Sequence, residues 1–196
     1  RTVIYVPLDE RPCNLAYPVR MLKASKALEV IVPPVDLLGR KKHPADIAGI
    51  RTFVEQHLQD ADALVFSTEM LAYGGLLPSR IYEVSDVMPN VTGYQAYVKG
   101  LKAAKPSLKI YASNLIMRTP RYSSGDEEPD YYETYGAQIF KYGWLKDKQR
   151  REGITDAKVD ELAKLQQDVP EAVIHDYETR RAANLKINLA NIQLVK

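Results

Sequence analysis

Polar side chains that could do chemistry cluster in three short segments, each directly after an apolar run. The first is LDERPCN, residues 8–14, where Asp9 and Glu10 could act as a general acid or base or as metal ligands. Arg11 could hold a carboxylate or a phosphate, and Asn14 could donate a hydrogen bond to a ligand. A structural alternative stays open, in which Asp9 and Arg11 pair within a turn and Asn14 caps a helix.

The second segment is STEMLAYGGLLPSR, residues 67–80. Its paired glycines, Gly74 and Gly75, permit a positive φ or a close approach of two backbones. Neither a GK[ST] nor a GxGxxG pattern is present, so the segment is not a recognisable phosphate or dinucleotide loop. It is long for a connection from strand to helix, and long loops in compact domains are often functional, which favours a functional role. The polar candidates beside the glycines are Glu69, Tyr73, Ser79 and Arg80.

The third segment is SNLIMRTPRYSS, residues 113–124, which carries Asn114, Arg118 and Arg121. The two arginines could clamp an anionic or polyhydroxylated ligand. Alternatively, they could pair with the acidic residues that follow, which are Asp126, Glu127 and Glu128. The two interpretations are evenly balanced.

Composition narrows the classes of partner. The chain has 27 basic and 25 acidic residues in a well-mixed order, so it lacks the basic excess typical of nucleic-acid binding. No apolar run approaches the length of a membrane span, so we expect no membrane partner. The expected partner is a small polar ligand. The three histidines show no metal-ligand spacing, and the sequence assigns neither a metal nor a cofactor.

Cys13 is the only cysteine, which excludes an internal disulfide and a cysteine-based zinc cluster. We expect it to be a small buried side chain, since free cysteine is among the most buried residue types. A chain with a single cysteine is compatible with a reducing compartment, so the sequence favours a cytoplasmic location.

Four short runs rich in β-branched and aliphatic residues alternate with helical patterns in the first part of the chain. They are residues 2–6, 28–32, 63–66 and 108–112. Between them, helical periodicity is expected after Pro44 and after Thr92, the latter as an N-cap. The pattern predicts an open, mainly parallel α/β sheet of about four to five strands, Rossmann-like or flavodoxin-like, with helices on both faces. Ligands bind such sheets beyond the carboxyl ends of the strands, where the polar segments begin.

Helical patterns dominate the rest of the chain. Pro129 is placed to begin one helix that Gly153 ends, and Thr155 can cap a second. Asp168 with Glu171 resembles a capping box at the start of a third. We therefore expect an α/β sheet domain over residues 1–120 and a helical C-terminal extension over 121–196. The extension either packs on the sheet domain or leads to a second α/β domain of the same gene product.

Five sequence blocks together resemble the bacterial domain-of-unknown-function family numbered 4127. They are VPLDERPCN, MLAYGGLLPSR, IMRTPRYSS, EEPDYYETYG and DYETRRAANLKIN, and they span most of the chain. The resemblance implies a longer protein with a further α/β portion after the present region. It also implies that an Asp commonly stands at the position of Glu69 here. The family motif positions that this chain keeps are Asp9, Glu10, Arg11, Pro12, Asn14, Tyr73, Gly74, Gly75, Ser79, Arg80, Arg118, Glu127, Glu128 and Pro129.

Two functional hypotheses follow from these residues. The first is a hydrolase-like enzyme that acts on a polar molecule such as a sugar derivative, with Asp9, Glu10 and Glu69 as the acidic groups. Its ligand would be held by Arg11, Asn14, Tyr73, Gly74, Gly75, Ser79, Arg80, Asn114 and Arg118. The second is a two-lobed binding protein that closes on a polar or anionic ligand without catalysis.

Overall fold

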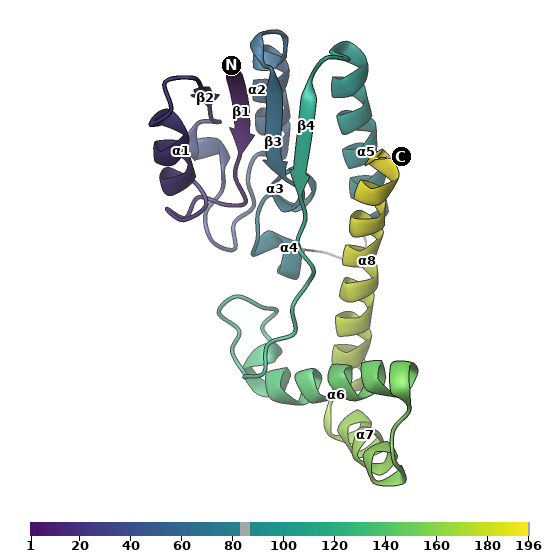
Figure 1. Ribbon diagram of the computed structural model, residues 1–196. Helices are drawn as coiled ribbons and strands as arrows, with labels where there is room; N and C mark the ends of the chain where they lie inside the picture. Colours follow the sequence, from purple (N-terminus) through teal and green to yellow (C-terminus); the bar gives the residue numbers. More distant parts are fainter. Residues whose placement is uncertain (83–86, 196) are drawn as a thin grey trace. The chain divides into compact units, whose positions relative to one another are not determined.

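The computed structural model describes residues 1–82 and 87–195, which form two compact units (Figure 1). Unit 1 consists of Arg1–Ile116 together with the segment that begins at Leu185. Unit 2 consists of Met117–Asn184. Unit 1 is therefore discontinuous in sequence, because unit 2 is inserted between its two parts.

The strands all lie in unit 1, and long helices make up most of unit 2. The strands are β1 (Thr2–Val6), β2 (Glu29–Ile31), β3 (Ala63–Ser67) and β4 (Lys109–Ser113). The helices of unit 1 are α1 (Ala16–Lys23), α2 (Ile47–His57), α3 (Thr68–Tyr73), α4 (Pro78–Ile81) and α5 (Val87–Ala104), with short 3-10 turns η1 (Val35–Leu37) and η2 (Leu58–Asp60). Unit 2 contains α6 (Tyr132–Glu152), α7 (Asp156–Asp168) and the first part of α8 (Glu171–Val195), whose second part belongs to unit 1.

The described residues contain a four-stranded sheet with the order β2-β1-β3-β4 (Figure 1). Neighbouring strands are parallel, and the register places Ile4 beside Leu64 and Leu64 beside Ile110. The predicted open α/β fold with a helical C-terminal region is confirmed. Its strands coincide with the four apolar runs to within a residue or two, because the sheet buries apolar side chains such as those of Ile4, Leu64 and Phe66.

Helices cover both faces of this sheet. The chain passes from β1 to β2 in one direction and from β2 through β3 to β4 in the other, so right-handed crossovers put α1 on one face and α2 and α5 on the opposite face. The α5 face is fully buried at Ile4 and Phe66, and the ring of Tyr94 from α5 packs edge-on against Phe66. On the α1 face, Tyr5 donates a hydrogen bond to the backbone carbonyl of Asn14 at 2.5 Å.

Several expected boundaries were wrong. Helix α2 begins at Ile47 and not near Pro44, because the Asp46 side chain caps it by accepting a hydrogen bond from the Gly49 N–H at 2.9 Å. Helix α5 begins at Val87, so Thr92 lies inside the helix instead of capping it.

The expectation that Cys13 is buried was wrong. This only cysteine is exposed, because it lies in the turn that leads from β1 to α1.

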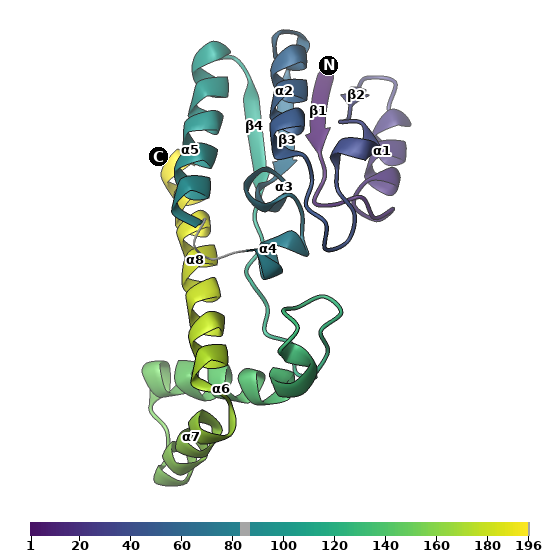
Figure 2. The same cartoon turned by 180° about the vertical axis from the view of Figure 1, so that it is seen from behind.

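Segment 67–80 is not a long loop. It folds into the short helices α3 and α4, which are separated by the paired glycines (Figure 2). Every residue of α3 is buried, so the segment lacks the polar face from which a helical period could be recognised.

The helices of unit 2 pack around an apolar core. Gly153 ends α6 as expected, and Thr155 occupies the N-cap position of α7, although its side chain makes no capping hydrogen bond. Asp168 is the last residue of α7 and does not belong to a capping box for α8. The buried core consists of Tyr132, Ile139, Tyr142, Leu145, Leu162, Leu165 and Tyr177. None of the helices that the structure describes is both long and apolar enough to pass through a membrane.

Candidate functional site

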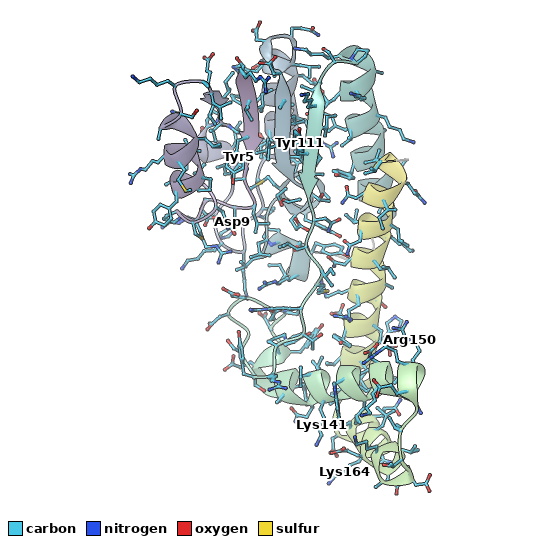
Figure 3. The ribbon with its side chains drawn as sticks, viewed as in Figure 1. Tyr5, Asp9, Tyr111, Lys141, Arg150 and Lys164 are labelled. Carbon is cyan, nitrogen blue, oxygen red and sulfur yellow. The ribbon has the colours of Figure 1, made fainter. Side chains whose placement is uncertain are left out.

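The carboxyl edge of the sheet in unit 1 brings polar residues from separate parts of the chain to one place. Loop 8–14 follows β1, α3 follows β3 directly, and Asn114 follows β4. Figure 3 shows Asp9 just beyond the carboxyl end of β1. Because the strands are parallel, all three connections leave the sheet at this edge.

Asp9 organises the first loop. It is buried, and its Oδ2 accepts a hydrogen bond from Nε of Arg11 at 3.0 Å and forms an ion pair with Nη2 of Arg11 at 2.8 Å. Its Oδ1 accepts from the backbone N–H of Arg11 at 3.1 Å and from Nδ2 of Asn14 at 2.7 Å. The side chain of Arg11 is 43% exposed. The pairing of Asp9 with Arg11 therefore occurs, and it fixes a guanidinium that solvent can still reach.

Glu10 points to a different partner from Asp9. Its Oε1 accepts a hydrogen bond from the backbone N–H of Lys41 at 2.9 Å, which ties the first loop to the turn after η1. Lys41 itself has a φ of 52°, a left-handed conformation that residues other than glycine rarely adopt. Glu10 is only partly buried, so among the acids of the first loop it is the more accessible one.

The glycine pair lies beside the first loop. Gly74 has a φ of +86°, and the backbone N–H groups of Gly74 and Gly75 close the end of α3 on the carbonyls of Met70 and Glu69. A Cβ added at Gly75 would lie 3.7 Å from the carbonyl oxygen of Leu8. The first and second predicted segments therefore meet at this edge.

Glu69 is buried and joins the ends of β3 and β4. Its Oε2 accepts a hydrogen bond from Oγ of Ser67 at 2.7 Å. Its Oε1 accepts from the backbone N–H of Leu115 at 2.7 Å and from Nδ2 of Asn114 at 3.3 Å. All three donors are neutral, and together they supply a partner for each carboxyl oxygen.

Helix α8 contributes two asparagines to the same network, and sequence reasoning missed both. Asn188 accepts a hydrogen bond from Asn114 at 2.8 Å. Asn191 donates to Oγ1 of Thr68 at 3.0 Å and also to Oδ1 of Asn114, and it accepts from the Tyr94 hydroxyl at 2.6 Å. Burial raises the pKa of Tyr94 to about 12, which keeps its hydroxyl a donor. The available signal was a pair of amide side chains three positions apart in the last part of α8, LKINLANIQLV, which is mostly apolar.

The other candidates of the second segment are buried beside the glycines. The ring of Tyr73 packs against the ring of Tyr82 with a centroid distance of 4.8 Å. Burial raises the pKa of Tyr73, and its neighbours Tyr82 and Glu69 raise it further. The Ser79 hydroxyl donates to the backbone carbonyl of Leu76 at 2.6 Å, and Arg80 is buried in α4.

Arg118 belongs to unit 2 and pairs there with acids. Its Nε contacts Glu128 at 3.0 Å and its Nη2 contacts Glu127 at 2.9 Å. The guanidinium of Arg121 lies over the ring of Phe140 at 5.2 Å from its centre. The acidic partners considered for Arg118 in the sequence are thus the ones it has, whereas Arg121 stacks on an aromatic ring.

Chemically, the edge of unit 1 offers a half-exposed guanidinium, an accessible carboxylate and a buried carboxylate that orients the guanidinium. The side chains of Arg11, Glu10 and Asp9 supply these groups. Within residues 1–82 and 87–195, no group of three or more His, Cys, Asp or Glu side chains is placed to hold a metal ion.

The chain was compared with protein-family models, with curated proteins and with solved structures. No curated protein and no solved structure matched the chain. The model of one protein family matches residues 3–196, nearly the whole length. The chain therefore belongs to the family described as Protein of unknown function (DUF4127), as the resemblance of its motifs indicated.

Proposed function

We propose that the carboxyl edge of the sheet binds a small polar or anionic molecule, such as a sugar derivative, and that the protein hydrolyses it. The observation that carries this proposal is the arrangement of Asp9, Arg11 and Asn14. Asp9 is buried and held by both neighbours, while the Arg11 guanidinium stays 43% exposed. A cation fixed in this way has lost its side-chain freedom before a ligand arrives, so less entropy is lost on binding.

The roles of the acids follow from their accessibility. Glu10 is partly buried, and a single backbone N–H contacts its carboxylate, so it is the acid best placed to exchange a proton with a ligand. Asp9 is a positioning residue, because both of its oxygens are occupied by Arg11 and Asn14. Glu69 likewise positions the ends of β3 and β4 through its three donors.

The test combines a substrate panel with charge-removing variants. The wild-type chain is assayed on chromogenic aryl glycosides and on N-acetylated amino sugars, and binding of the same compounds is measured by calorimetry. Glu10→Gln should abolish turnover while it leaves affinity within a factor of about two, and Arg11→Ala should weaken affinity by about ten-fold or more. Asp36→Asn, a neutralisation at an exposed acid of η1, is the matched control and should change neither.

A non-catalytic binding protein is the second candidate, favoured by one specific observation. Each oxygen of Asp9 and of Glu69 accepts a hydrogen bond from within unit 1, an arrangement that suits a fixed polar framework better than proton exchange. In that case a ligand would bind saturably without product, and Glu10→Gln would behave as the wild type. The second α/β domain and the cytoplasmic location stay predictions.

A further inference from the structure

An apolar groove of about 620 Å³ lies in unit 1, on the face of the sheet that α5 covers. Its floor is formed by Phe66 of β3 and by Ile110 and Ala112 of β4. One wall comes from α5 and the other from the end of α8, and both are mostly apolar. The groove is separate from loop 8–14, since no residue of that loop lines it.

The walls expose apolar side chains, and the free energy decreases when a ligand removes these side chains from water. Ile192 is 55% exposed and Val195 is 89% exposed, and both line the groove. Burying such side chains contributes about 25 cal/mol per Å² of apolar surface removed from water. An aliphatic chain in the groove would therefore be held by the ordinary hydrophobic effect, as in other ligand sites of this size.

Two lysines of α5 give the groove a charged end. Lys99 and Lys102 line it, and Nζ of Lys102 donates to the backbone carbonyls of Pro106 and Leu108 at 2.7 and 2.9 Å, just before β4 begins. The lysines thus lie toward the start of β4. In the part of the chain that the structure describes, neither ammonium group forms an ion pair with a carboxylate.

The opposite end of the groove is polar but uncharged. Tyr94 and Asn191 line it there and are hydrogen-bonded to each other at 2.6 Å, close to the carboxyl ends of the strands. The groove therefore differs along its length. Two cations lie at one end, apolar walls lie in the middle, and two neutral side chains that are hydrogen-bonded to each other lie at the other end.

We propose that this groove binds a single-chain amphiphile with an anionic head, such as a medium-chain fatty acid. The head lies at Lys99 and Lys102, and the aliphatic tail runs along Ile110 and Ala112 toward Tyr94. The charge of the lysines selects the head because no acid of the described chain neutralises them, and the apolar walls select the tail. This proposal does not depend on the function proposed for the carboxyl edge.

The test is competition against a fluorescent fatty acid, 11-(dansylamino)undecanoic acid, with the whole chain. Decanoate should displace the probe at about ten-fold lower concentration than decanol, and decyltrimethylammonium should displace it least, since the lysines repel its head. Lys99→Glu should weaken decanoate by about ten-fold while decanol is unchanged. Lys26→Glu, the same charge reversal at an exposed site outside the groove, should alter neither.

A variant that blocks the groove distinguishes binding in the groove from binding elsewhere on the protein. Ala103→Trp adds bulk to an exposed position of α5 that lines the groove, and it should abolish displacement by every compound while the circular dichroism spectrum is unchanged. Equal displacement by all three head groups, or no response to Lys99→Glu, would overturn the proposal. So would a dimer that Ala103→Trp dissociates and that binds no decanoate, because the groove would then be covered by a second copy.

Discussion

The acidic residues at the carboxyl edge differ in what surrounds them. Asp9 accepts three hydrogen bonds from Arg11 and Asn14 and forms an ion pair with Arg11. Glu69 accepts three hydrogen bonds from neutral groups, so both acids hold the surrounding structure in place. Glu10 accepts one from the backbone of Lys41 and is only partly buried. These three acids look equivalent in the sequence, but Asp9 and Glu69 have structural roles and Glu10 is the candidate for proton transfer.

Gly74 is required by its surroundings as well as by its φ of +86°. A Cβ there would lie 2.7 Å from the backbone nitrogen of Ala45, which donates to the Gly74 carbonyl at 3.0 Å. Gly74→Ala should lower the free energy of unfolding by about 2 kcal/mol or more, since strain and steric conflict add. The measurement is urea denaturation followed by circular dichroism.

Gly100→Ala is the matched comparison. Gly100 lies in the exposed interior of α5, and a Cβ added there meets nothing within 4 Å. The substitution should raise the free energy of unfolding by about 0.5–1 kcal/mol, because alanine favours helix over glycine. Equal effects of the two substitutions would show that the contact with Ala45 is unimportant.

The sequence indicates part of the candidate site, and the rest escapes prediction for a physical reason. Asp9, Glu69 and Asn114 were found because each follows an apolar run that becomes a strand. Asn188 and Asn191 were missed because their partners are more than seventy positions away in sequence, and the periodicity of a helix says nothing about such distant contacts.

At the scale of the elements, prediction was best for the strands. In β1 and β3 the β-branched and aliphatic runs agree with the burial of Ile4, Val6, Leu64 and Phe66, so local sequence and tertiary environment favour the same structure. Helix starts were less predictable: Pro44 suggests a helix start, but α2 begins at Ile47, where the Asp46 side chain caps it. The helices of segment 67–80 cannot be recognised from the sequence, because a helix buried on all sides, such as α3, carries no amphipathic pattern.

The junction of α2, η2 and β3 depends on one side chain from the end of α5. Nζ of Lys105 donates to the carbonyls of Leu58, Gln59 and Ala61 at 3.2, 2.7 and 2.6 Å. A cation satisfies carbonyls at the end of a helix and interacts favourably with its dipole. Lys105→Met keeps the length of the side chain and should lower the free energy of unfolding by about 1–2 kcal/mol.

The control for Lys105→Met is Lys26→Met, at an exposed lysine between α1 and β2. It should change the free energy of unfolding by less than about 0.5 kcal/mol, the usual range for surface substitutions. Thermal and urea denaturation of both variants give the comparison. If the two variants were equally stable, the three bonds of Lys105 would contribute nothing net.

Across the whole molecule, buried tyrosines should make the fold sensitive to alkali. Burial raises the pKa of Tyr94 to about 12, and burial also raises the pKa values of Tyr131 and Tyr132. The fold thus favours the protonated phenols. Their stabilisation is fully present below pH 10, the ordinary tyrosine pKa, and decreases as the pH rises above 10. The contribution of Tyr94 is lost between pH 10 and about pH 12.

The alkaline prediction is checked by urea denaturation at pH 8 and pH 11, with tyrosinate absorbance recorded in parallel. The free energy of unfolding should fall between the two values. Tyr94→Phe should reduce that fall, since a pKa shift of one unit corresponds to about 1.4 kcal/mol. Tyr17→Phe, at a 57% exposed ring, should not reduce it. Equal stability of the wild type at both pH values would contradict the prediction.

The discontinuity of unit 1 has a consequence for how the protein emerges from the ribosome. Residues 1–116 carry the whole sheet, yet Asn188 and Asn191, which complete the network around Asn114, are translated only after the sixty-eight residues of unit 2. A nascent chain can build its strands early, but Asn114 must wait for its partners on α8. Because the chain is synthesised from its N-terminus, the hydrogen-bond network at the carboxyl edge of the sheet is completed late in folding.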